Sequence, residues 1–145
     1  MGDALITRRG GSGGGSANPI VLYFTGQGNS HGTAPAACTE LQAMVDSGYL
    51  RNDGNGNFTV LKAGTFSVSA LIKGGYNGGG TIIYSQVRVK KNSTSVIDIT
   101  TTSNAPAYQT VQAPFDANDT LTILTRNTNA NSSNTHSCAV ALQLV

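Results

Sequence analysis

The stretch FSVSALI at residues 66–72 alternates between apolar and small polar side chains. Phe66, Val68, Ala70 and Ile72 occupy every second position, and serines stand between the first three of them. Because successive side chains of a β-strand point to opposite faces of the sheet, this spacing places all four apolar residues on one face. The stretch therefore predicts a strand with one side against a core and the other toward water, as in an antiparallel sheet.

Segments of the same kind recur along most of the chain. A buried strand is predicted over residues 20–25, and further strands are predicted over residues 83–90, 94–100, 108–112, 121–125 and 138–144. Polar turn segments separate many of them, among them residues 52–57, 91–93 and 116–119. Roughly seven or eight short strands with polar turns between them indicate an all-β protein, an antiparallel β-sandwich of the jelly-roll kind.

One segment before the main strands has helical rather than alternating spacing. Thr33 could cap a helix that has Pro35 in its first turn, and Gly48 stands where a C-terminal stop belongs. The apolar residues that would share one face of this helix are Ala37, Leu41, Met44 and Val45. The spacing predicts one short helix between residues 33 and 48.

The composition limits the class of protein. The chain has 145 residues, enough for one domain with a single core. Only 11% of the residues are charged, against about 25% in an ordinary soluble domain, and the formal net charge is +2. Low charge argues against a helical bundle and against a charged disordered tail. It also argues against nucleic acid as a partner, because each phosphate contact generally calls for a cation or an aimed donor.

Membrane insertion and enzyme chemistry are not indicated either. No apolar stretch approaches the roughly 18 residues that cross a bilayer, and residues 1–15 lack the apolar run of a secretory signal. His31 and His136 are the two histidines, and neither sits in a nucleophile motif. Their spacing to Cys38 does not match a closed zinc site. We therefore expect no catalytic residue, no metal and no cofactor.

The two cysteines, Cys38 and Cys138, lie 100 residues apart. This spacing matches no metal-ligand or redox motif. Two free buried thiols that pack as small apolar residues are the favoured interpretation, and a disulfide between them is the alternative. The sequence leaves this choice open.

The first 16 residues differ from the rest of the chain. An apolar and basic peptide comes first, formed by Leu5, Ile6, Thr7, Arg8 and Arg9. The Gly/Ser tract at residues 10–16 follows and is typical of a flexible tether. We expect residues 1–16 to be an arm that docks on a partner by strand addition, with its arginines at an acidic rim, and residues 17–145 to be the head. The alternative is a solvated basic tail.

A glycine-rich loop is predicted between two of the strands, at residues 74–80. Tyr76 and Asn77 within this loop could contact a ligand, because a tyrosine ring offers an apolar face and an amide both donates and accepts hydrogen bonds. Glycan or protein recognition uses such side chains. A merely flexible turn is the alternative, and it is the favoured one.

Several segments resemble the complement globular-head branch of the tumour-necrosis-factor-like jelly rolls. They are FTVLKAGTFSV at residues 58–68, VRVKKN at residues 87–92 and FDANDTLTI at residues 115–123. The last strand departs from the family pattern, because Cys138-Ala139-Val140 replaces the expected Phe-x-Gly. The resemblance spans residues 49–145. It implies a compact homotrimer that serves binding rather than catalysis.

The opening GDALITRRGG at residues 2–11 resembles the start of minor structural proteins of phages and prophages from Gram-positive hosts. Together the two resemblances imply an arm that docks on a particle and a trimeric head that projects from it. The expected protein is a non-enzymatic virion component, a capsid decoration, head fibre or tail appendage, made in the host cytoplasm. Its expected partners are two further copies of itself, capsid or tail proteins of the same virion, and a host cell-surface glycan or protein.

A second hypothesis is a secreted or spore-surface module of the same fold that binds a carbohydrate or a protein. The residues do not distinguish a head position from a tail position on a particle, and they do not identify a receptor.

Overall fold

The computed structural model describes residues 18–28, 35–73, 84–101, 105–128 and 136–145. Within this part the chain forms strands and turns and contains no helix. The strands in chain order are β1 (Ile20–Gly28), β2 (Ala36–Ala37), β3 (Thr39–Val45), β4 (Leu50–Gly54), β5 (Asn57–Val60), β6 (Gly64–Lys73), β7 (Tyr84–Lys91), β8 (Thr94–Thr101), β9 (Pro106–Phe115), β10 (Thr120–Thr128) and β11 (His136–Leu144).

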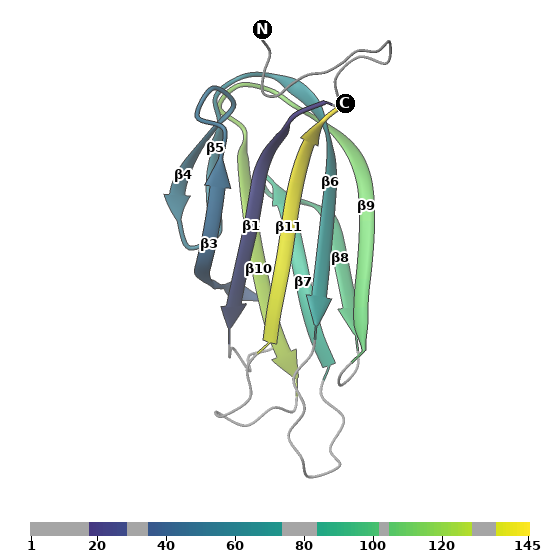
Figure 1. The fold of residues 1–145 in the computed structure, drawn as a ribbon. Coiled ribbons are helices and arrows are strands. Elements are labelled where there is room, and N and C mark those ends of the chain that lie inside the picture. Colours follow the sequence, from purple (N-terminus) through teal and green to yellow (C-terminus); the bar gives the residue numbers. More distant parts are fainter. Residues whose placement is uncertain (1–17, 29–34, 74–83, 102–104, 129–135) are drawn as a thin grey trace, which may run out of the picture.

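The strands form two antiparallel sheets that pack face to face (Figure 1). Sheet A has the order β3-β1-β11-β6-β9, and sheet B has the order β4-β5-β10-β7-β8, with the short β2 also paired to β10. Neighbouring strands in each sheet are antiparallel throughout. The predicted all-β class and the antiparallel sandwich are therefore confirmed.

The core lies between the sheets and consists of the inward side chains of both. In β6, Phe66, Val68, Ala70 and Ile72 are all buried, as the alternation predicts. Aromatic rings in the core make three edge-to-face contacts: Phe66 with Phe115 at 5.7 Å between centroids, Phe66 with Tyr49 at 6.2 Å, and Phe24 with Phe58 at 6.0 Å. These contacts stabilise the core, because edge-to-face pairs add to the free energy of burial.

The helix predicted between residues 33 and 48 is wrong for every residue that the structure describes there. Residues 39–45 form β3, the edge strand of sheet A, paired with β1. Thr25 lies opposite Gln42 and Gly26 opposite Glu40, so Leu41 is the extra residue of a β-bulge. The bulge shifts the in-out alternation by one residue. A strand whose alternation slips in this way places apolar residues at spacings that resemble a helix.

The hairpin predicted at residues 52–57 is confirmed and depends on glycine. Gly54, Asn55 and Gly56 all have positive φ angles, of 96°, 51° and 79°. Only glycine adopts this region without strain from a Cβ atom. Gly56 is constrained further, because its carbonyl accepts a hydrogen bond of 2.8 Å from the backbone amide of Ile123 in β10.

We expect Gly56→Ala to destabilise the protein by about 3 kcal/mol, and Gly54→Ala by only about 1 kcal/mol. A Cβ on Gly56 would lie 2.8 Å from the Ile123 carbonyl oxygen, whereas a Cβ on Gly54 would have no atom within 4 Å. Both variants carry the strain of a positive φ, and only the first adds a clash with a neighbouring strand. Urea unfolding of the two variants measures the difference. Equal losses would show that the contact with β10 is unimportant.

The two ends of the sandwich are distinct. At one end the described chain begins beside the last strand, where the amide of Leu144 donates to the carbonyl of Pro19 at 2.9 Å. At the opposite end lie the strand termini that flank residues 29–34, 74–83, 102–104 and 129–135 (Figure 1). A segment that precedes residue 18 therefore joins the head at the pole away from these connections.

Candidate functional site

The charged residues of the described chain are unevenly divided between the two sheets. Strands β1, β9 and β11 contain no Asp, Glu, Lys or Arg, and the other two strands of sheet A contain one each, Glu40 in β3 and Lys73 in β6. Sheet B carries the larger share, namely Arg51, Asp53, Arg88, Lys90, Lys91, Asp98 and Arg126. The strands of sheet A therefore carry few charged residues, and most of the charged strand residues lie in sheet B.

The outer face of sheet A exposes several large apolar or aromatic side chains. Tyr108 is 66% exposed, Met44 is 61% exposed and Tyr23 is 43% exposed, and Leu71 lies close to them in the pairing register. Scattered exposed apolar residues are normal, but a gathering on one uncharged sheet face is typical of an interaction surface. We call the set Tyr23, Met44, Leu71, Tyr108, Ala139 and Ala141 the apolar face.

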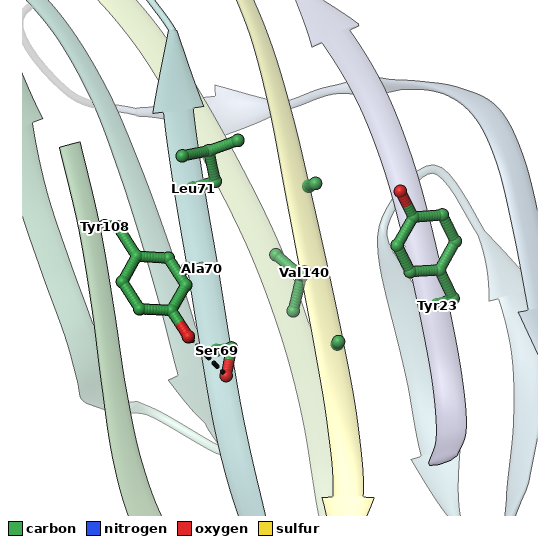
Figure 2. A pocket seen from close by; sticks show the side chains of 8 residues that line it. Tyr23, Ser69, Ala70, Leu71, Tyr108 and Val140 are labelled. Atoms are coloured by element: carbon green, nitrogen blue, oxygen red, sulfur yellow. Dashed lines mark hydrogen bonds between the residues drawn. The ribbon is translucent and has the colours of Figure 1, made fainter. Parts of the chain in front are cut away.

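A shallow depression with a volume of about 270 Å³ runs over the middle of this face (Figure 2). Ala139 and Ala141 of the central strand β11 line it. Tyr23 of β1 stands on one side of β11, and Leu71 and Tyr108 stand on the other (Figure 2). The depression follows from the sequence of β11, the central strand of sheet A. Two alanines on its outer side leave a hollow between the larger side chains of the flanking strands.

The strand register explains which residues meet. Two rows of outward side chains cross the sheet, with Tyr23, Ala141, Ser69 and Thr110 in one and Thr25, Ala139, Leu71 and Tyr108 in the next. Each row carries an alanine at its centre, on β11. Because cross-strand neighbours lie within contact distance, the register builds one continuous surface from residues far apart in the sequence.

Three hydroxyl groups at one edge of the depression bond to one another. The Thr110 hydroxyl donates to the Tyr108 oxygen at 2.6 Å, the Tyr108 hydroxyl donates to Ser69 at 3.5 Å, and the Ser69 and Thr110 oxygens are 3.0 Å apart. Hydrogen bonding with Ser69, and next with Thr110, holds the pKa of the Tyr108 hydroxyl below its ordinary value. A surface whose hydroxyls are already paired loses less free energy when water is removed from it.

The predicted contact residues lie outside the described part of the chain. This applies to the docking residues Leu5, Ile6, Thr7, Arg8 and Arg9, to the loop residues Tyr76 and Asn77, and to His31. Among the residues described, no group of three or more His, Cys, Asp or Glu side chains could hold a metal ion. The same part of the chain contains no helix long and apolar enough to cross a membrane.

Sequence reasoning did not find the apolar face. Tyr23 stands in an apolar run at residues 20–24, which predicts a fully buried strand, and its side chain points outward instead. The available signal was the absence of charge from the segments 20–28, 106–115 and 136–144 combined with alanine at two alternate positions of the last, 139 and 141. That signal becomes clear only when the topology places these three strands in one sheet.

Comparison with known proteins identifies the fold. No protein-family model and no curated protein matches the sequence. Among solved structures, murine APRIL matches with a TM-score of 0.54 at 10% identity, over 86% of this chain and 98% of that one. Rabbit GITRL matches with a TM-score of 0.50 at 14% identity, over 84% and 93%. Vertex protein P5 of phage PRD1 matches with a TM-score of 0.56 at 15% identity, over 90% and 100%.

The sandwich is therefore a tumour-necrosis-factor-like jelly roll, as the sequence resemblance implies. The three structures named here are two cytokines of the tumour-necrosis-factor family and a phage structural protein, and none of the three is an enzyme. Because these sequence identities are between 10% and 15%, the comparisons establish the fold of this chain and nothing about its role.

Proposed function

We propose that the protein is a non-enzymatic virion structural protein, with a homotrimeric jelly-roll head held on a phage particle by its N-terminal arm. The observation that carries the proposal is the uncharged apolar face of sheet A. Such a face is stable in water when it is covered, and a closed oligomer covers it with the same face of identical chains. The likeness to PRD1 vertex protein P5 supports a phage origin and a location on the virion.

The side chains of the apolar face suit an interface with two further copies of this chain. Tyr23 and Tyr108 offer large rigid contact areas, and aromatic residues are enriched at the cores of interfaces. The alanines of β11 let another backbone or ring approach closely. The paired hydroxyls of Ser69, Tyr108 and Thr110 supply polar atoms that already have partners. The jelly-roll resemblance implies that the number of copies is three.

The difference between the two ends of the head supports an anchoring role for the arm. Residues 1–16 join the sandwich at the pole where Pro19 contacts Leu144. The strand termini next to residues 29–34, 74–83, 102–104 and 129–135 lie at the other pole. A head attached at the first pole would present the second pole outward, away from the particle. Tyr76 and Asn77 belong to a connection of that second pole and are our candidates for contact with a host glycan or protein.

We expect removal of residues 1–16 to leave a folded head that no longer incorporates into particles. The described core is built from residues of the head, from Val21 to Leu142, so we expect the thermal transition of the truncated protein to match that of the full chain. Particles assembled with the truncated protein and purified by sedimentation should lack it on immunoblots. Replacement of residues 5–9 by a Gly/Ser segment of equal length is the matched control, because it keeps the tether and removes only Leu5 to Arg9.

Incorporation of both variants at the level of the full chain would overturn the anchoring role. Absence of the full chain itself from purified particles would instead favour the alternative function, a secreted or spore-surface module that binds a carbohydrate or a protein. That module needs no arm, so all of its partners should bind the truncated head. Failure of the Gly/Ser variant to incorporate would assign the anchor to the apolar and basic peptide.

A further inference from the structure

The two cysteines, distant in sequence, meet in the interior where the two sheets are joined. Cys38 lies between β2, which pairs with β10 of sheet B, and β3, which pairs with β1 of sheet A. Cys138 lies in β11 of sheet A, opposite Gly26 of β1. The chain at Cys38 is thus the crossover from one sheet to the other, and Cys138 belongs to the central strand of sheet A.

The two thiols are buried and contact each other. Cys38 is 2% exposed and Cys138 is 4% exposed, and both are free thiols that share a hydrogen bond. The Cys38 sulfur also donates to the carbonyl oxygen of Ile123 at 3.7 Å. A Cβ added to Gly56 would come within 3.4 Å of the same sulfur, so glycine there leaves room for the thiol.

The surroundings suit a sulfur–sulfur bond better than a metal. In the described part of the chain no third His, Cys, Asp or Glu side chain joins the pair, and a structural zinc site needs four ligands. A disulfide needs only two sulfurs at contact distance and side chains directed at each other. The two thiols share a hydrogen bond inside the core, so their side chains lie next to each other.

The hydrogen bond also gives the two thiols different roles. The hydrogen bond with Cys138 lowers the pKa of the Cys38 thiol, because the donated proton stabilises the Cys38 thiolate. The same bond and burial raise the pKa of the Cys138 thiol. Because the thiolate is the attacking species in thiol chemistry, Cys38 is the first of the two to react. It is also next to β2, a strand of two exposed residues, which a small local opening would release.

We propose that Cys38 and Cys138 form an intramolecular disulfide that links the β2–β3 crossover to β11 after the protein leaves a reducing compartment. The oxidant is a small-molecule disulfide such as oxidised glutathione. The Cys38 thiolate attacks one sulfur of the oxidant, forms a mixed disulfide and releases one thiol. Cys138 then attacks the Cys38 sulfur, giving its proton to the second departing thiol. The net reaction converts two protein thiols and one small disulfide into one protein disulfide and two small thiols.

The bond would stabilise the folded head after the particle has assembled. It closes a loop of 100 residues, and cross-links that close long loops remove the most entropy from the unfolded chain. Its timing rests on the proposed virion function, because assembly in a reducing cytoplasm would precede exposure to an oxidising medium. The bond itself does not rest on that function, since it forms in the isolated protein.

The test treats the purified full chain with oxidised glutathione. We expect the intact mass to fall by two hydrogen atoms per chain, both thiols to disappear from a thiol titration, and the melting temperature to rise by about 10 °C. Dithiothreitol should reverse all three changes. Peptide mapping should place the bond between residues 38 and 138. Cys138→Ala should instead accumulate a stable glutathione adduct at Cys38, whereas Cys38→Ala should react far more slowly at Cys138.

Three results would overturn the proposal. They are an unchanged mass after oxidation up to temperatures just below the unfolding transition, stable glutathione adducts on the unmodified chain without an internal bond, and disulfides between chains only. The measurement on the unmodified chain decides the question even where an alanine variant does not fold. Because it needs no particle, its failure is separable from failure of the virion proposal.

Discussion

Replacing Ala141 by glutamate is expected to convert the protein from a trimer to a monomer at micromolar concentration. Ala141 lines the depression in the apolar face, in the same cross-strand row as Tyr23 and Ser69. In the proposed trimer the new carboxylate would be buried without a cationic partner, in each of the three chains. An uncompensated buried charge costs about 3 to 5 kcal/mol, and every 1.4 kcal/mol weakens association about tenfold.

Light scattering coupled to gel filtration measures this effect directly. The matched control is Ser95→Glu, which adds the same charge to an exposed position in β8 of sheet B. This control should keep the mass of the unmodified protein. An unchanged mass for Ala141→Glu as well would mean that the apolar face is not the interface between copies.

Phe66→Ala is expected to lower the stability of the fold far more than truncation of an exposed apolar side chain does. Phe66 is fully buried and contacts the rings of Tyr49 and Phe115. Truncation of a buried phenylalanine removes its burial free energy and leaves a cavity, at a cost of about 3 to 5 kcal/mol. For a domain of this size the melting temperature should fall by about 10 to 20 °C.

Thermal unfolding followed by circular dichroism checks the expectation for Phe66. Leu61→Ala is the control, because it also truncates an apolar side chain but at a position that is 42% exposed. We expect it to lower the melting temperature by no more than a few degrees. Similar shifts for the two variants would contradict the assignment of Phe66 to the centre of the core.

Most of the strands could be predicted because each one carries its own alternation. In β6, β7 and β10 the buried core residues recur at every second position, and the turns between strands are marked by asparagine, aspartate and glycine. The segment at β3 could not be predicted by the same rule. Its bulge at Leu41 is set by pairing with β1, a contact across the sheet that no local pattern records.

The candidate surface depends on topology in the same way. Tyr23, Leu71, Tyr108 and Ala141 lie in four different strands, and only the order β1-β11-β6-β9 makes them neighbours. The cysteine pair is a second example, because a separation of 100 residues carries no information on proximity. Composition did indicate a low-charge surface, and the sheet order shows on which face that surface lies.

The native mass of the full chain in solution tests the central claim most directly. Native mass spectrometry at micromolar concentration should give a complex of three times the chain mass of 14.9 kDa. A single species at 14.9 kDa would contradict the trimeric head and leave the apolar face of sheet A without its proposed cover.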